Sequence, residues 1–409
     1  MICLIYKGSM VFFKAVFLSW AYFFNNIVFL FFSGNHFQCN IKQNTFLNNL
    51  TKRHMEFSNQ SLVTQFIIVG FPDLDGYEAL LFFFLSIAYI FTLCGNFTII
   101  TLICTYCQLH VPLYLFVAEL SFLEIWYTTV TVPKMLTILL NVKIISYVGC
   151  LLQIYFFHIL GVRETYLLTV MAFDRYMAIC NPLRYPCIIT IVCCFQMAAF
   201  GWVIGFLGPL TQIILLSHLA FCGSNRVEHI FCDFNPLMNL ACSDISLNVR
   251  VNFAINSFLL FLAFTCILMS YFKIISTVLK IKTAEGRKKA FSTCGAHLTV
   301  VFLFFCSASF MYVRPIKTNT VKYDRIMALI YSVLTPMCNP VIYSLRNQEI
   351  RRLLRKKIKK LFESPSLSWQ IHFSSIKILQ FGYFKRQPQP ENKGISSANM
   401  LQVFSTTLY

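Results

Sequence analysis

Charged residues are scarce in this chain of 409 residues, where Asp, Glu, Lys and Arg together make up 12%. A soluble domain carries about a quarter charged residues, so the composition argues against a water-soluble globular protein. Hydrophobic residues make up 57% of the chain, and 44 residues are phenylalanine. This balance indicates that lipid surrounds much of the chain.

The chain also lacks the residue spacings that carry common catalytic chemistry. It contains no phosphate-binding loop and no nucleophile elbow. His229, Asp233 and Asp244 share one predicted loop, but their spacing is not typical of a metal site. We therefore expect no enzyme activity, no cofactor and no metal centre.

Long hydrophobic runs are what the chain has in abundance. Seven windows reach the roughly 20 apolar residues that cross the hydrocarbon core of a bilayer. Their apolar residues are continuous rather than alternating, which favours helices over a barrel of strands. The sequence therefore predicts an all-α membrane protein, a bundle of seven transmembrane helices. The predicted spans are residues 79–104, 113–137, 149–173, 188–216, 249–279, 290–312 and 325–345.

The net charge of +18 is concentrated in two basic clusters, one between spans five and six and one after span seven. Both clusters lie on one side if all seven spans cross, and the positive-inside rule makes that side cytoplasmic. We interpret the excess as a lipid-facing rim rather than a nucleic-acid site, and expect a plasma-membrane protein with an extracellular N-terminus and a cytoplasmic C-terminus. The clusters comprise Lys280, Lys282, Arg287, Lys288 and Lys289, then Arg351, Arg352, Arg355, Lys356, Lys357, Lys359 and Lys360.

The two ends of the chain fit poorly with the predicted bundle. Residues 1–54 could be a cleaved signal peptide, an eighth span or an extension that the working protein lacks, and we favour the extension because Met55 opens a plausible second start. Residues 55–345 form the predicted bundle and 346–362 a short basic amphipathic helix at the inner interface. Residues 363–409 form a cytoplasmic tail without a clear period.

Polar residues on the predicted outer side suggest covalent modification. Asn59 begins an Asn-Gln-Ser triplet, an acceptor for N-glycosylation. Four cysteines are expected there, at the start of span three and in the loop before span five. Four cysteines allow three pairings, and the spacing does not choose among them. They are Cys150, Cys222, Cys232 and Cys242.

One face of span three carries a series of residues that suits signal transmission. Helical spacing aligns Phe157 and Glu164 with Arg175, and at 1.5 Å rise they lie ~27 and ~16 Å from it. A buried acid must face the bundle rather than lipid. Glu124 in span two is a second such acid, and the two could share a proton or a cation, or join Asn96 in a polar cluster that fixes helix packing.

Two motifs at the inner ends of spans suggest a conformational switch. Asp174, Arg175 and Tyr176 end span three, and Asn339, Pro340 and Tyr343 lie near the end of span seven. A proline removes a helix hydrogen bond and leaves a carbonyl free, so span seven is expected to kink at Pro336 and Pro340. A lone Asn-Pro pair would be weak evidence, but the two motifs together, each at the inner end of its span, are strong evidence for such a switch.

From about residue 55 to residue 360 the chain resembles a rhodopsin-like G-protein-coupled receptor, and more closely an odorant (olfactory) receptor. The most specific motifs of this resemblance are Met-Ala-Phe-Asp-Arg-Tyr-Met-Ala-Ile-Cys at 171–180 and Lys-Ala-Phe-Ser-Thr-Cys-Gly-Ala-His at 289–297. Further marks lie at 95–96, 109–114, 120–124, 133–136, 270–271 and 336–347.

The resemblance implies a cavity for small volatile odorants, and coupling to a stimulatory G protein that raises cyclic AMP. It implies disulfides between Cys150 and Cys232 and between Cys222 and Cys242. By motif position, the cavity would be lined by Phe157, His158, Gly161, Val162 and Phe305.

The sequence departs from the family pattern in three respects, one of which is that its long ends, 1–54 and roughly 363–409, have no counterpart in the family. Glu124 stands where the family more often has Asp, and Phe305 with Cys306 stands where Tyr-Gly is more usual. Two other interpretations stay open: a non-functional receptor-like product, suggested by the unusual ends, and an ion-coupled transporter, suggested by the two buried acids.

Overall fold

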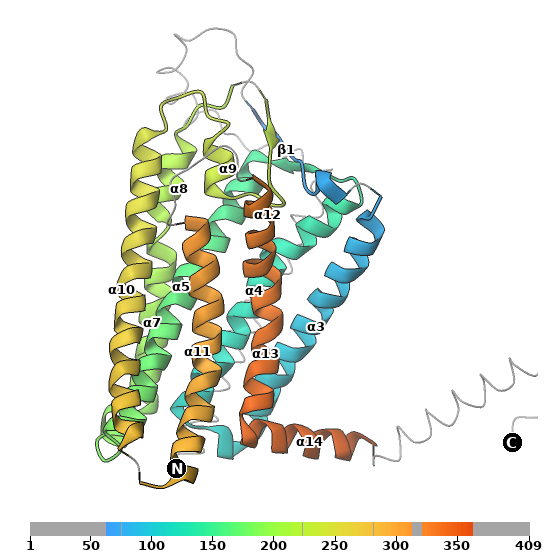
Figure 1. Cartoon of the computed structure of the whole chain (residues 1–409). Helices are drawn as coiled ribbons and strands as arrows, with labels where there is room; N and C mark the ends of the chain where they lie inside the picture. Colours follow the sequence, from blue (N-terminus) through green and yellow to red (C-terminus); the bar gives the residue numbers. More distant parts are fainter. Residues whose placement is uncertain (1–62, 75, 223, 281, 313–320, 363–409) are drawn as a thin grey trace, which may run out of the picture. The chain divides into compact units, whose positions relative to one another are not determined.

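The helical bundle that the apolar windows predict is present in a computed structural model of the chain (Figure 1). The structure describes residues 63–362, apart from Asp75, Gly223, Ile281 and residues 313–320. Within that part, seven helical segments are long and apolar enough to cross a membrane. The expectations for residues 1–54, for Asn59 and for residues 363–409 lie outside the described residues.

The long helices lie side by side and agree with the predicted spans within a few residues at most ends. The fourth and seventh spans are each built from more than one helical piece. The elements are α3 (Glu78–Thr105), α4 (Pro112–Leu139), α5 (Tyr147–Cys180), α7 (Ile191–Leu207) with α8 (Leu210–Ser217), α10 (Ser246–Leu279), α11 (Ala284–Tyr312), and α12 (Val321–Leu329) followed by α13 (Thr335–Arg346).

Local side-chain chemistry sets several of the helix ends. Ser146 Oγ accepts a hydrogen bond from the backbone N–H of Gly149 at 3.1 Å and so caps the start of α5. Pro112 opens α4, where its missing N–H would have had no helical partner. Just beyond α4, Asn141 adopts a left-handed φ of 64°, which turns the chain toward the next strand.

Span seven is irregular one turn before its first proline. Between α12 and α13 the chain forms a π-helical turn, η4 (Ile330–Leu334). The ring of Pro336 prevents a regular hydrogen bond to the preceding turn. In this turn the carbonyl of Ile330 accepts hydrogen bonds from both the backbone N–H of Thr335 and, at 3.2 Å, its Oγ1. The predicted irregularity therefore takes the form of a widened turn, and Pro340 lies inside α13.

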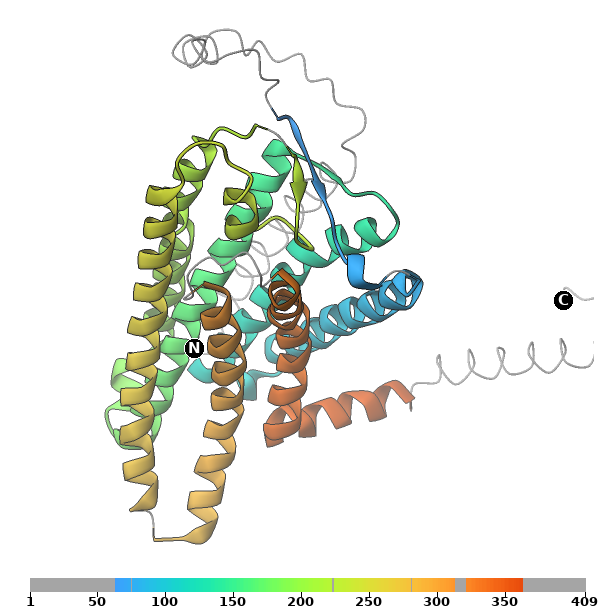
Figure 2. The ribbon, with the colours of Figure 1, turned by 45° about the horizontal axis from the view of Figure 1, so that its top comes forward.

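A small sheet at one end of the bundle was not predicted, because its strands are too short to form a hydrophobic window. β1 (Gln65–Ile68) is the central strand, antiparallel to β2 (Ile144–Ser146) and parallel to β3 (Arg226–Val227). Figure 2 shows β1 beside β3 above the helices. Phe66 and Ile68 point from β1 into a buried apolar cluster.

Two disulfides fasten the loop between the fourth and fifth spans within the described residues. Cys150 at the start of α5 is bonded to Cys232, with their Cα atoms 5.4 Å apart. Cys222 is bonded to Cys242 within the loop, with a Cα separation of 5.8 Å. A short helix of this loop, α9 (Phe234–Met238), is buried against the bundle. The loop therefore forms a fixed cover over this end of the molecule.

The helices α4 and α5 lie at the centre of the bundle and share a buried ion pair. Arg163 of α5 donates from Nη2 to Glu119 of α4, and the two side chains are 0% and 3% exposed. The guanidinium carbon also lies 5.6 Å from the ring centre of Trp202 on α7. A Cβ atom at Gly201 would come within 2.6 Å of the Arg163 guanidinium and the Tyr166 ring, so a larger residue there would force these side chains to shift.

The predicted amphipathic helix is α14 (Gln348–Phe362), which begins after an extended residue at Asn347. Asn347 Oδ1 accepts hydrogen bonds from the backbone N–H groups of Glu349 and Ile350 and caps the helix. The chain divides into compact units after Arg351, and α14 crosses that division.

We expect Arg163→Leu to lower the free energy of unfolding by about 3–5 kcal/mol, because it leaves Glu119 buried without its partner. Replacing Glu119 with leucine as well should recover most of that loss. Thermal denaturation of the purified protein measures both changes. As a control, Glu228→Gln breaks an ion pair whose carboxylate side chain is 57% exposed and should cost less than about 1 kcal/mol. A single Arg163 variant as stable as this control would contradict the prediction.

We also expect the two disulfides to contribute unequally to stability. Replacing Cys150 and Cys232 by alanine should cost about 2–5 kcal/mol. The same change at Cys222 and Cys242 should cost about 1 kcal/mol less, because that bond closes a separation of 20 residues rather than 82. Denaturation of the two double variants compares them, and equal losses would contradict this ranking.

Candidate functional site

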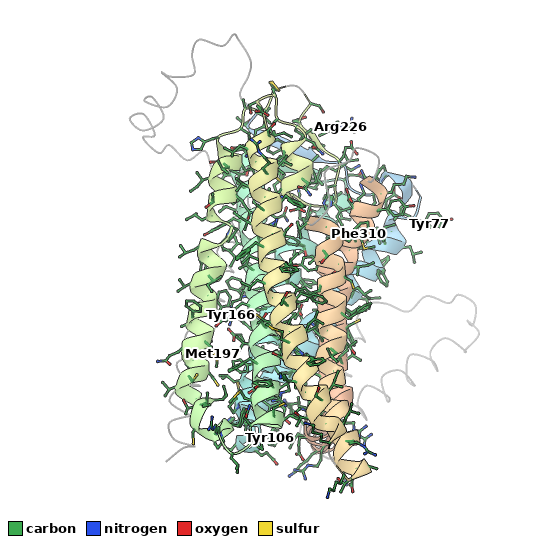
Figure 3. All side chains as sticks on the ribbon, turned by 60° about the vertical axis from the view of Figure 1, so that its left-hand side comes forward. Tyr77, Tyr106, Tyr166, Met197, Arg226 and Phe310 are labelled. Carbon is green, nitrogen blue, oxygen red and sulfur yellow. A yellow bond between two sulfur atoms is a disulfide. The ribbon has the colours of Figure 1, made fainter. Side chains whose placement is uncertain are left out.

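A cavity of about 280 Å³ lies inside the bundle, between α5 and α10 and beneath the disulfide-fastened loop. Figure 3 looks onto this side of the molecule, with Tyr166 of α5 between α7 and α10. The wall is formed mainly by α5, α10 and α11, with one residue each from α4, α7 and the seventh span. The lining residues are Tyr127, Phe157, His158, Gly161, Val162, Thr165, Tyr166, Thr169, Ile204, Asn256, Leu259, Leu260, Leu262, Ala263, Cys266, Phe304, Ala308, Tyr312 and Tyr331.

The structure brings four of the five expected ligand residues together in this wall, namely Phe157, His158, Gly161 and Val162. Phe305 does not line the cavity. It is buried beside Phe264, with ring centres 5.6 Å apart, and its neighbour Phe304 lines the cavity instead. Adjacent residues of an α-helix point about 100° apart, so Phe304 faces the cavity and Phe305 faces Phe264.

Most of the polar groups along α5 are already satisfied and leave the wall apolar. Thr165 and Thr169 donate their hydroxyls to the carbonyls of Gly161 and Thr165, one turn earlier. Asn256 donates to Asn252 Oδ1 at 3.0 Å. The hydroxyl of Tyr127 is buried and lies beside the hydroxyl of Tyr331, which also lines the cavity. The cavity therefore suits a small apolar molecule with few polar groups.

The outer end of the cavity is tied to the loop by a His–Asp–Tyr cluster. His158 directs Nδ1 to the carbonyl of Ile154 at 3.0 Å and places Nε2 3.7 Å from Asp233 Oδ1. The hydroxyl of Tyr312 donates to Asp233 Oδ2 at 3.4 Å. Burial raises the pKa of Asp233 to about 7, although the N–H of Phe234 partly opposes this. The cluster joins α5, α11 and the loop in one place.

The acids expected at mid-membrane have different surroundings. Glu124 accepts a hydrogen bond from Asn339 Nδ2 of the seventh span. Asn96 is also fully buried, but it donates to the carbonyl of Thr92 at 3.0 Å and not to Glu124. Glu164 lies close enough to Glu124 for electrostatic interaction, and its Oε1 has no hydrogen-bond partner among the described residues. The polar cluster therefore links α4 to the seventh span.

A histidine connects three helices between the cavity and the far end of α5. The hydroxyl of Tyr271 on α10 lies 2.8 Å from His297 Nδ1 on α11. His297 Nε2 lies 3.1 Å from the carbonyl of Leu168 on α5. Because a carbonyl only accepts, Nε2 carries the proton and Nδ1 accepts from the tyrosine hydroxyl. A relative shift of any of these helices must break this bridge.

At the far end of α5, Asp174 and Arg175 form an ion pair with each other. Asp174 Oδ1 also accepts a hydrogen bond at 2.8 Å from the hydroxyl of Tyr185, on the short helix α6 (Tyr185–Ile188). Burial raises the pKa of Tyr185, so its hydroxyl keeps the proton it donates. Asp174 is buried, and the Arg175 side chain is 11% exposed.

Two other switch residues lie near this ion pair, because Tyr176 directly follows Arg175 and Tyr343 is close enough to Arg175 for electrostatic interaction. Tyr176 lines a groove between α5 and α10. A Cβ atom at Gly95 would come within 3.0 Å of the Pro340 ring, which shows how closely α3 and α13 pack. Tyr343 is buried, and its hydroxyl has no hydrogen-bond partner among the described residues.

The sequence interpretation missed the Glu119–Arg163 pair and the bridging role of His297. Glu119 and Arg163 lie five and one residues before the two acids that were singled out. Any charged residue within an apolar span is a candidate for an internal partner, so scanning every charge would have found both. The role of His297 depends on contacts between three helices and has no such signal.

Comparison with known proteins agrees with these features. Residues 85–361 match the family model described as olfactory receptor. Olfactory receptor 6N1 of Homo sapiens is 50% identical over 308 residues, which are 75% of this chain and 99% of that protein. Olfactory receptor 6K2 of Homo sapiens is 46% identical, over 74% of this chain and 94% of that protein. Olfactory receptor 6B9 of Mus musculus is 44% identical, over 73% and 95% respectively.

These matches confirm the family resemblance and the seven-helix membrane fold drawn from the sequence. Olfactory receptors are G-protein-coupled receptors of the plasma membrane that bind odorants, and they are not enzymes. Both the matched length and the arrangement of the seven spans support the same assignment. The chain belongs to the olfactory receptor family.

Proposed function

We propose that this protein is an odorant receptor that binds small, volatile, mostly apolar molecules in the cavity beside α5 and activates a stimulatory G protein, raising cyclic AMP. The observation that carries the proposal is that one helix, α5, lines the cavity and ends in the Asp174–Arg175 pair. A ligand that favours one arrangement of α5 and its neighbours would therefore change the surface at the far end.

The cavity supports the ligand class through its size and its walls. About 280 Å³ is enough for a small molecule and excludes a peptide. Phe157, Val162 and Phe304 supply apolar contact, and His158 and Tyr127 supply the few polar groups. Transfer of apolar ligand surface out of water then supplies most of the binding free energy.

The proposed switch separates the inner ends of the helices. His297 holds α5, α10 and α11 together, and the polar cluster of Glu124 and Asn339 holds α4 to the seventh span. In the active arrangement Arg175 leaves Asp174 and faces a crevice that accepts a helix of the G protein. The residues of this switch are Asp174, Arg175, Tyr176, Asn339, Pro340 and Tyr343.

The proposed orientation places the sheet and the disulfide-fastened loop outside the cell and Arg175 at the cytoplasmic face. The basic residues after α10 and in α14 support it through the positive-inside rule. Basic residues alternate with apolar residues along α14, which suits the inner membrane interface. We propose Asn59 as the glycosylation site on the outer side, with residues 1–54 as an extension that the working receptor lacks.

A cyclic AMP reporter in cells that express the chain, screened with a panel of odorants, tests the proposal directly. We expect at least one small apolar odorant to raise cyclic AMP in a saturable way. Cells that carry the receptor at their surface and respond to no odorant would support the non-functional alternative. Comparing the chain with and without residues 1–54 tests the proposed extension in the same assay.

We expect Ala263→Phe to weaken the response to an activating odorant by about tenfold or more, because overpacking the cavity costs about 1–3 kcal/mol. Ala263 lines the cavity from α10 and is 8% exposed. Ala254→Phe is the matched control, since it makes the same change at an exposed position of the same helix. Concentration–response curves measure both variants. Equal responses from the two would argue against this cavity as the ligand site.

We expect Arg175→Ala to reduce odorant-evoked cyclic AMP about tenfold or more, since hydrogen bonds to charged groups contribute about 1.5–3 kcal/mol. Arg226→Ala, at an exposed arginine of β3 on the opposite end of the bundle, is the control. Antibody labelling of intact cells shows that both variants reach the surface. An Arg175→Ala receptor that reaches the surface and signals normally would rule out the proposed role of this side chain.

A further inference from the structure

A second hollow lies on the outside of the bundle, between the halves of α5 and α10 nearest Arg175, and has a volume of about 430 Å³. Its rim faces the hydrocarbon of the membrane, because Phe173 and Met269 are 40% and 58% exposed although both are strongly apolar. Figure 3 shows α10 along the whole length of this side. Neither Asp174 nor Arg175 lines the groove, although the next residue, Tyr176, does.

The walls of this groove offer almost no free polar group. Thr169 donates its hydroxyl to the carbonyl of Thr165 at 2.9 Å, and Ser270 donates to the carbonyl of Cys266 at 2.9 Å. Both hydroxyls are therefore satisfied within their own helices and present methyl or methylene groups to the groove. Such a surface suits a flexible hydrocarbon chain.

One cation stands at the end of the groove nearest the helix terminus. Lys273 lines it, six residues before the end of α10, or ~9 Å along the helix axis. Its ammonium makes no ion pair with a carboxylate in the described part of the chain. A lysine at this depth extends toward the headgroup layer and gains from an anionic partner there.

We propose that this groove is a binding site for an anionic phospholipid of the inner leaflet, with one acyl chain between α5 and α10 and the phosphate at Lys273. The complementary parts are an apolar trough and a lysine that forms no ion pair within residues 63–362 as the structure describes them. Lys280 and Lys282, just beyond α10, extend the positive surface toward the same headgroup layer. The inference rests on the proposed function only in assigning this end of the bundle to the cytoplasm.

The lipid would share two residues with the odorant cavity. Thr169 and Cys266 line both the groove and the cavity. An acyl chain in the groove therefore packs against the inner end of the ligand site. A lipid that restricts the motion of Thr169 and Cys266 from the groove therefore also changes how an odorant packs against them in the cavity.

Photo-cross-linking of the full-length receptor tests the proposal without odorant or G protein. The receptor is placed in vesicles of phosphatidylcholine that contain a trace of phosphatidylserine or phosphatidylcholine carrying a diazirine on one acyl chain. Cross-linked peptides are identified by mass spectrometry. We expect phosphatidylserine to label peptides containing residues 169–176 and 266–273 about fivefold more than phosphatidylcholine does, from one lysine–anion contact.

Three variants make the test specific. Lys273→Gln should bring the ratio of the two lipids close to one, whereas Lys280→Gln, outside the groove, should keep the preference. Ser270→Phe fills the trough and should abolish groove labelling by both lipids. Equal labelling of the unmodified receptor by the two lipids, or an unchanged preference in Lys273→Gln, would overturn the proposal.

The outcome is independent of signalling. A receptor that shows selective labelling and no odorant response would contradict the proposed function and leave the lipid site intact. A receptor that responds to odorants but labels equally with the two lipids would contradict the lipid site and leave the proposed function intact.

Discussion

A bilayer offers no water to a buried polar group, so the polar groups of α5 find their partners either within α5 itself or on a neighbouring helix or loop. His158 meets Asp233 of the covering loop, and Arg163 meets Glu119 of α4. Further along, the carbonyl of Leu168 meets His297 of α11, and Asp174 meets the hydroxyl of Tyr185. Together with the Cys150–Cys232 disulfide, these contacts make α5 the element against which the other helices are positioned.

The distribution of these contacts explains where the molecule can bind and where it can move. The polar partners of α5 lie toward α4, α11 and the loop, so the side toward α10 keeps mainly apolar surface. Both the ligand cavity and the lipid-facing groove lie on that side. Helix packing there depends on contacts between apolar groups, and a shift on this side leaves no buried charge without its partner. A ligand can therefore bias helix positions at low cost.

Most of the fold and part of the candidate site could be predicted from sequence motifs and composition. The spans follow from apolar length, and Phe157, His158, Gly161 and Val162 line the cavity as the family resemblance implies. Phe305 shows the limit of such prediction. A motif gives a residue's position along a helix, but not which neighbouring helices that residue faces once the bundle has packed. The partner of Glu124 shows the same limit, since Asn339 of a distant span supplies the hydrogen bond that Asn96 does not.

The sequence alone determined that the chain crosses a membrane seven times, because apolar length and basic clusters act through the solvent and not through particular contacts. It also determined the family, because the inner-end motifs are local. The cysteine spacing left three pairings open, and the structure contains the two disulfides that the family resemblance implies. Only the tertiary structure decided that Arg163 is neutralised by Glu119, and that Phe304 rather than Phe305 lines the cavity. Those outcomes depend on distances between residues far apart in the chain, and such distances exist only after the helices have packed.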